Sequence, residues 1–255
     1  SLPVEGKFSF FTHRLGDSVF LYSQFNDKLG YTCLYKYNFQ TKKRTLYPKI
    51  EITSQTILTN DGQIIFIINS GGIHRMEADS MRMIRSFNFP KRSMVVYNSV
   101  CIEPGILAVS GCFGLITYNY KTGAVDTIFQ KENYCVRSIW KYKDYLFFGT
   151  YGTGFYIYKN GVTKQMPLDK RSFLLYTHCF MPDGQGFLWM STNRGLFKAN
   201  LQDLLDAFDK NKTNIYYHYF GKNDGMQMTE LNGGCSPCAL LLKNGHFSFP
   251  SMDGL

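Results

Sequence analysis

The sequence lacks any hydrophobic run long enough to cross a membrane. Its longest stretch of aliphatic and aromatic residues, Ile64–Ile68, is far shorter than the ~20 residues of a transmembrane helix. The opening residues, Ser1–Glu5, contain neither the basic nor the apolar segment of a signal peptide. We therefore expect either a cytosolic protein or a piece cut from a longer, exported chain.

Charged residues are scarce, at 18% of the 255 residues, and only 2 residues are tryptophan. A chain with so few charges and 44% hydrophobic residues is neither disordered nor a coiled coil. The other aromatic residues are abundant, with 18 Tyr and 22 Phe, and they occur together with 23 Gly. This mixture favours strands and tight turns over helices.

Acidic residues are the minority among the charges, with 19 Asp and Glu against 28 Lys and Arg, for a net charge of +9. Such a balance permits a polyanionic partner. The longest basic run is Lys42–Arg44, and no nucleic-acid-binding motif is present. We therefore expect no nucleic-acid partner.

The seven cysteines are odd in number, and most lie within apolar stretches, as Cys101 does. There a cysteine acts as a small hydrophobic residue, so we expect no secreted disulfide framework. Cys235 and Cys238 form a C-x-x-C motif, but no helix follows to activate a redox thiolate. No second Cys or His pair stands at zinc-ligand spacing. The sequence predicts core or loop cysteines, with no metal and no cofactor.

Internal repetition is the most informative feature of the chain. A glycine followed by a short apolar or aromatic run recurs every 40–42 residues, at Gly30, Gly72, Gly114, Gly154 and Gly195. Turn dipeptides such as Asp61-Gly62 and Asn244-Gly245 open the preceding run in several repeats, and these are strong hairpin signals. Four short strands in each unit of ~40–45 residues are typical of a β-propeller blade.

The sequence therefore predicts an all-β fold: residues 1–255 form one β-propeller, or part of one, built from four-stranded antiparallel blades. Five complete units and a partial sixth are expected at about 8–48, 49–90, 91–131, 132–170, 171–220 and 228–255. The fifth unit holds an insertion. There Leu201–Phe208 predicts an amphipathic helix capped by Asn200, and Ile215–Phe220 the delayed fourth strand.

The fifth unit resembles the repeat of two-component regulator propellers, because Asp183–Leu196 follows that family's D-x-x-G turn and its l-W-i-g-T-x-x-G-l strand pair. Phe148–Phe155 in the fourth unit keeps part of the pattern. The closing stretch, Gly221–Leu255, is similar to the last blade of these sensors, with an E-x-N-G-G run at Glu230–Gly234.

This resemblance implies a periplasmic sensor domain of a hybrid histidine kinase/response regulator of the Bacteroides type. Such a domain would bind an oligosaccharide and relay the event to downstream immunoglobulin-like and signalling domains of the same chain. The resemblance thus implies an excised periplasmic fragment of an inner-membrane protein, and it leaves a homodimer open.

Two other functions use the same fold and stay open: a propeller glycoside hydrolase or lyase, and a protein-interaction scaffold. Glycoside hydrolysis requires two carboxylates ~5–9.5 Å apart. The conspicuous carboxylates instead stand beside turns or in the inserted helix, at Asp17, Asp61, Asp144, Asp183, Asp253, Asp203, Asp206 and Asp209. Turn formation is the usual role of an Asp before Gly. We expect no catalytic residue and no enzymatic activity in this fragment.

Basic residues recur at one phase of the repeat. Counting thirteen residues back from the turn before the second strand reaches Lys49, Arg92, Lys131 and Arg171 in units two to five, whereas the last unit has Asn232 at this place. Blades are related by rotation, so we expect these side chains to form a ring around one mouth of the central channel. With the nearby Lys91, Arg137 and Lys170, they are predicted to bind an acidic ligand such as a uronate-containing or sulfated glycan.

Overall fold

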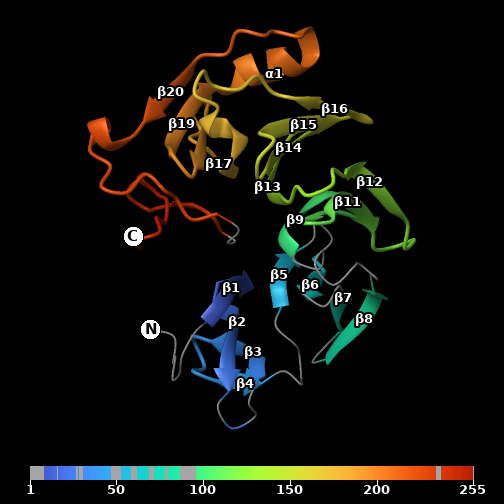
Figure 1. Ribbon diagram of the computed structural model, residues 1–255. Coiled ribbons are helices and arrows are strands. Elements are labelled where there is room, and N and C mark those ends of the chain that lie inside the picture. Colours follow the sequence, from blue (N-terminus) through green and yellow to red (C-terminus); the bar gives the residue numbers. More distant parts are fainter. Residues whose placement is uncertain are drawn as a thin grey trace.

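The computed structural model describes residues 9–15, 17–26, 28, 31–46, 53–58, 62–68, 72–77, 80–86, 96–233 and 237–254. These residues form antiparallel sheets of four strands, in which consecutive strands pair with one another. Figure 1 shows the sheets following one another around a central axis. The predicted all-β propeller is confirmed.

Each four-stranded sheet is one blade. Blade one holds β1 (Ser9–Leu15), β2 (Val19–Asn26), β3 (Tyr31–Asn38) and β4 (Arg44–Leu46). Blade two holds β5 (Thr53–Leu58), β6 (Ile64–Ile68), β7 (Gly72–Glu77) and β8 (Ser80–Ser86). Blade three holds β9 (Val96–Glu103), β10 (Ile106–Gly111), β11 (Gly114–Asn119) and β12 (Val125–Phe129).

Blade four holds β13 (Val136–Tyr142), β14 (Tyr145–Thr150), β15 (Phe155–Lys159) and β16 (Val162–Gln165). Blade five holds β17 (Thr177–Pro182), β18 (Phe187–Thr192), β19 (Gly195–Asn200) and β20 (Tyr217–Phe220). A two-stranded sheet, β21 (Leu240–Leu241) with β22 (Phe247–Ser248), follows blade five. Short 3₁₀ turns occupy Phe173–Leu175 and Lys222–Asp224.

The first strand of each blade lies nearest the axis. Consecutive first strands β1, β5, β9, β13 and β17 contact one another in that order, and together they form the inner wall from blade one to blade five. In blades three and four burial is highest in the second strand and lowest in the outermost strand. Every residue of β14 is buried, whereas β16 at the edge of the same sheet has no buried residue. Blades therefore pack face to face through their middle strands, and these strands are apolar on both faces.

The predicted helix is confirmed. Helix α1 (Leu201–Lys210) begins directly after β19, and the Asn200 side chain accepts a hydrogen bond from the Asp203 backbone N–H at 3.2 Å. Its apolar face buries Leu204 and Phe208 in a core that also contains Phe147 of blade four. The helix thus covers the junction between blades four and five, and β20 follows it as the fourth strand. Among the described residues, no helix is both long and apolar enough to cross a membrane.

The prediction of a chain without a disulfide framework is wrong. Cys112 is bonded to Cys135, and Cys179 is bonded to Cys238. The sequence did not indicate this pairing, because the two cysteines of each disulfide come from neighbouring parts of the ring that are distant in sequence. Cys33 and Cys101 form no disulfide, and Cys235 of the C-x-x-C motif lies outside the described residues.

Candidate ligand site at the channel mouth

A β-bulge recurs at the second residue of four consecutive inner strands, β5, β9, β13 and β17. On β9, β13 and β17 the first and third residues pair with adjacent residues of the second strand, and the residue between them is the bulge residue. The pairs are Val96–Gly111 and Asn98–Ser110, Val136–Thr150 and Ser138–Gly149, Thr177–Thr192 and Cys179–Ser191. These bulge residues are Tyr97, Arg137 and His178. A bulge redirects a side chain, and rotation between blades brings these three to the same mouth of the channel.

Arg137 lies between two tyrosine rings that come from different blades. Its guanidinium carbon is 4.6 Å from the centre of the Tyr97 ring and 4.5 Å from the centre of the Tyr151 ring. Tyr97 belongs to β9 of blade three, and Tyr151 directly follows β14 of blade four. Both rings attract the cation through their π faces. Among the described residues, no carboxylate forms an ion pair with Arg137, and its buried Nε atom has no hydrogen-bond partner.

Tyr151 connects Arg137 to blade five. Its ring stacks on the His178 ring at 5.9 Å, and its hydroxyl accepts a hydrogen bond from Asn193 Nδ2 at 3.2 Å. The other end of the same amide, Asn193 Oδ1, bonds to His178 Nε2. Because Oδ1 only accepts, this arrangement assigns the imidazole proton to Nε2. A continuous set of contacts therefore runs from blade three through blade four to blade five.

His178 is buried at this junction, with 2% of its surface exposed. Burial lowers its pKa, and the nearby Arg137 charge lowers it further, while the Asn193 hydrogen bond and Glu230 act in the opposite direction. The lowered pKa keeps His178 neutral at pH 7. Gly233 packs against this ring so closely that any Cβ atom at that position would collide with it.

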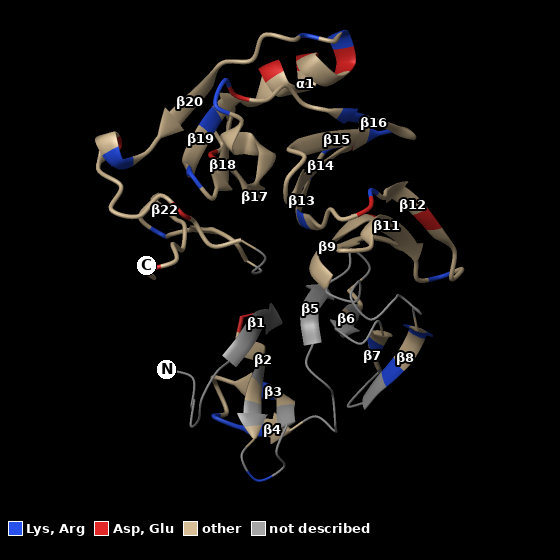
Figure 2. Cartoon of the chain, viewed as in Figure 1, with Lys and Arg blue, Asp and Glu red and all other residues tan. Residues whose placement is uncertain are grey.

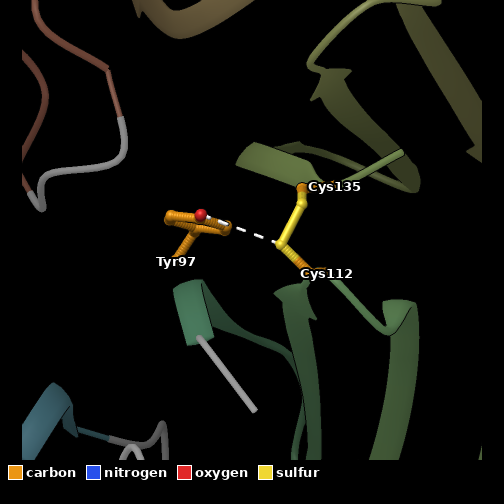
Figure 3. The surroundings of a disulfide bond; sticks show 3 residues. All are labelled: Tyr97, Cys112 and Cys135. Carbon is orange, nitrogen blue, oxygen red and sulfur yellow. Dashed lines mark hydrogen bonds between the residues drawn. A yellow bond between two sulfur atoms is a disulfide. The ribbon is translucent and has the colours of Figure 1, made fainter. Parts of the chain in front are cut away.

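The Cys112–Cys135 disulfide supports the other side of the mouth. It joins the turn between β10 and β11 to the connection that enters β13. Figure 3 shows the Tyr97 ring beside this disulfide, with its hydroxyl 3.7 Å from Cys112 Sγ. Since a disulfide sulfur carries no proton, the hydroxyl is the donor. The bond therefore ties together the two blades that supply Tyr97 and Arg137.

The structure places the predicted basic residues in different surroundings. Lys49 and Arg92, together with Lys91, lie outside the described residues. Lys131 is exposed, with its ammonium 5.2 Å from the Tyr134 ring centre. Arg171 is also exposed, at 5.7 Å from the Tyr219 ring and 6.0 Å from the Phe173 ring. Lysines and arginines are spread over several blades (Figure 2), and the ring of four cations stays a prediction.

A groove of about 630 Å³ lies beside Arg171. Aromatic side chains form much of its lining, namely Phe173, Phe197, Tyr216, Tyr217 and Tyr219. Its two carboxylates already have partners within the protein. Asp203 forms an ion pair with Lys212 at 2.6 Å, and Asp169 accepts hydrogen bonds from the backbone N–H groups of Arg171 and Leu174. The groove is therefore built for contact rather than for acid–base chemistry.

Turn formation and ion pairing also account for the other carboxylates named from the sequence that the structure describes in detail. Asp183 accepts hydrogen bonds from the backbone N–H groups of Gln185 and Phe187, and these bonds and Lys198 hold its pKa low despite partial desolvation. Asp144 pairs with Lys159 at 3.2 Å and Asp206 with Lys210 at 3.1 Å. In the described part of the chain, no cluster of three His, Cys, Asp or Glu residues is suited to a metal ion.

Sequence reasoning named Arg137 only as a neighbour of the ring, and it missed Tyr97, Tyr151, His178 and Asn193. A signal was present for two of them. Tyr151 and Asn193 each directly follow the threonine that ends a second strand, although the turn to the repeat glycine is one residue longer after Thr150 than after Thr192. The bulge residues had no such signal, because a bulge depends on strand register.

Solved structures agree with the propeller fold. The extracellular domain of the hybrid two-component system BT4673 from B. thetaiotaomicron is similar, with a TM-score of 0.50 and 14% identity over 93% of this chain and 38% of that chain. The AfRom2 CNH domain gives a TM-score of 0.60 at 8% identity, covering 98% of this chain and 79% of that one. BamB from Moraxella catarrhalis gives 0.51 at 13% identity, covering 93% and 77%.

At these identities the likenesses show the fold alone. The chain spans only 38% of the length of the BT4673 domain. No protein-family model and no curated protein sequence matches it.

Proposed function

We propose that this propeller is the extracytoplasmic, ligand-sensing part of a two-component regulatory sensor, and that it recognises an oligosaccharide at the channel mouth. The observation that carries the proposal is the cluster of Tyr97, Arg137 and Tyr151, which places two aromatic rings beside a guanidinium group that has no ion-pair partner among the described residues. Ligand sites typically combine such apolar surface with a few polar groups. The sequence resemblance to two-component regulator propellers points to the same role.

The disulfides support the extracytoplasmic assignment. Disulfides persist in oxidising compartments such as the periplasm and are rare in the cytosol. Two of them connect parts of the ring here, across 23 and 59 residues of sequence. A cytosolic propeller has no need for such links.

A relay follows from the way the site is shared among blades. Blade three supplies Tyr97, blade four supplies Arg137 and Tyr151, and blade five supplies His178 and Asn193. A ligand that contacts all three blades favours one relative packing of them over others, and a ligand shifts an equilibrium by its differential affinity for the two states. Downstream domains of the same chain would read that shift. No residue of the cluster is assigned a catalytic role, because the carboxylates serve turns and ion pairs.

Thermal-shift screening and calorimetry of the full chain against plant and host glycans test this proposal. We expect at least one oligosaccharide to raise the melting temperature, and Tyr151→Ala to abolish that rise. Tyr216→Ala is the matched control, since Tyr216 is 76% exposed and lies in the groove beside Arg171. Failure of every glycan to bind, or the appearance of new reducing ends during incubation, would contradict the proposal.

A further inference from the structure

We infer that Arg137 binds the anionic group, a carboxylate or a sulfate, of an acidic sugar at the channel mouth. The inference rests on the proposed function and names the ligand class of that site. The sequence predicted a ring of cations on the connections between blades as the anion contact. The inference instead assigns this contact to one guanidinium group on an inner strand.

The first argument is the missing counter-charge. Arg137 is half-buried, and buried charges in proteins are normally paired. Its Nε is buried without a partner, its aromatic neighbours Tyr97 and Tyr151 are uncharged, and the nearby His178 is neutral. Glu230 is close enough for its charge to raise the pKa of His178, but its side chain is exposed to solvent. Among the described residues, none supplies Arg137 with a negative partner.

The second argument is the direction left open for a ligand. A guanidinium group is planar and donates its hydrogen bonds in the plane. The ring centres of Tyr97 and Tyr151 lie 4.6 Å and 4.5 Å from its central carbon. These two positions beside the guanidinium group are therefore occupied by aromatic rings. An anion bound by this group would therefore lie along its N–H edge. Two parallel N–H groups on that edge match the two oxygens of a carboxylate or a sulfate.

The third argument is the contrast with Arg171. This second arginine also has aromatic neighbours, but at 5.7 and 6.0 Å, and its side chain is exposed. Exposed charges are screened at physiological salt, where the Debye length is about 8 Å. Partial burial protects Arg137 from much of this screening, which favours it as the anion contact. Arg171 therefore serves as the matched control.

The test is titration calorimetry of the full chain with trigalacturonate and with its fully methyl-esterified form, which keeps the sugar rings but removes the charge. A sulfated galactan trisaccharide in a parallel arm separates sulfate from carboxylate recognition. Hydrogen bonds to a charged group correspond to roughly 10- to 100-fold in affinity. We expect the acidic form to bind at least 10-fold tighter than the ester, and Arg137→Gln to remove that preference. Arg171→Gln should change affinity by less than about twofold.

Arg137→Lys keeps the proposal testable if Arg137→Gln perturbs folding. It retains the charge but loses the planar pair of donors, so we expect weakened binding with an unchanged melting temperature. Equal affinity for acid and ester, or an equal loss in both arginine variants, would overturn the inference. If only neutral glycans bind, the inference fails and the proposed function stands. If no glycan of either kind binds, both fail.

Discussion

The interior beneath α1 and the channel mouth are built from the same strands, yet they differ in almost every physical respect. Beneath α1, Phe147 and Leu204 are fully buried in one continuous apolar core. At the mouth, Arg137 and His178 carry buried nitrogen atoms without hydrogen-bond partners. Unpaired buried polar groups cost free energy, so the core supplies the stability that the mouth lacks.

Core residues and residues of the mouth are found within the same strand. In β13, Ile139 packs into the core between blades three and four, while Arg137 two residues earlier faces the tyrosine rings. A bulge makes that change possible, because it releases one residue from the alternation of the strand. The comparison therefore teaches that the apolar core and the polar cluster proposed to bind a ligand lie at different places along the same strands. Substitutions in the two regions should have separable effects.

The largest effect should come from the interior. Phe147 has no exposed surface and packs on the rings of Trp140 at 5.0 Å and Phe180 at 6.0 Å. We expect Phe147→Ala to lower the free energy of unfolding by about 3–5 kcal/mol, because it removes buried apolar surface and leaves a cavity. Urea unfolding measures the change. Tyr216→Ala on the exposed groove is the control, and a comparable loss there would break the distinction between core and surface.

Removing the link between blade five and the closing segment should cost less. Replacing Cys179 and Cys238 with alanine opens a loop of 59 residues, and we expect a loss of about 2–4 kcal/mol. The same change at Cys112 and Cys135, which are 23 residues apart, should cost about 1 kcal/mol less in the chain-entropy account. It should also weaken ligand binding, since that bond supports Tyr97. Equal binding by both double variants would contradict this role.

The cap of α1 should have a smaller effect. Asn200→Ala removes the acceptor for the Asp203 backbone N–H, and we expect a loss of about 1 kcal/mol. Asn200→Asp keeps an acceptor at the helix start and should retain most of the stability. Thermal melting of the two variants checks the difference. Ligand affinity should be the same in both, because the helix lies over the interior and not at the mouth.

The smallest effect we expect is a pH dependence at the mouth. Burial lowers the pKa of His178 below its ordinary value of 6.5, so the unfolded chain binds this proton more readily than the folded one. Stability is therefore present above pH 6.5 and falls as the pH drops towards the folded pKa. His74, whose pKa burial also lowers, adds to the loss.

Melting curves between pH 7.5 and about 5 measure this dependence. His178→Gln should reduce the acid-induced fall in melting temperature, and the exposed His218→Gln serves as its control. Arg137→Gln should raise the pKa of His178, because it removes a nearby positive charge. An unchanged histidine titration in NMR spectra would show that the two groups are not coupled.

Much of the fold follows from local pattern. The regular spacing of Gly114, Gly154 and Gly195, and the short strand-forming runs between turn residues, can be read directly along the chain. These two features were enough to predict the blades. The helix at Leu201–Lys210 was equally local, since its cap and apolar spacing stand within one short segment.

Only the tertiary structure decided the disulfides and the site. Cys112 meets Cys135, and Tyr97 meets Arg137, because neighbouring blades bring distant residues together. The one-residue shift at each bulge depends on how two strands pair, and the pattern of residues within one strand does not record it. Sequence by itself determined the repeating unit of this protein, whereas packing between units placed Arg137 between two tyrosine rings that come from different blades.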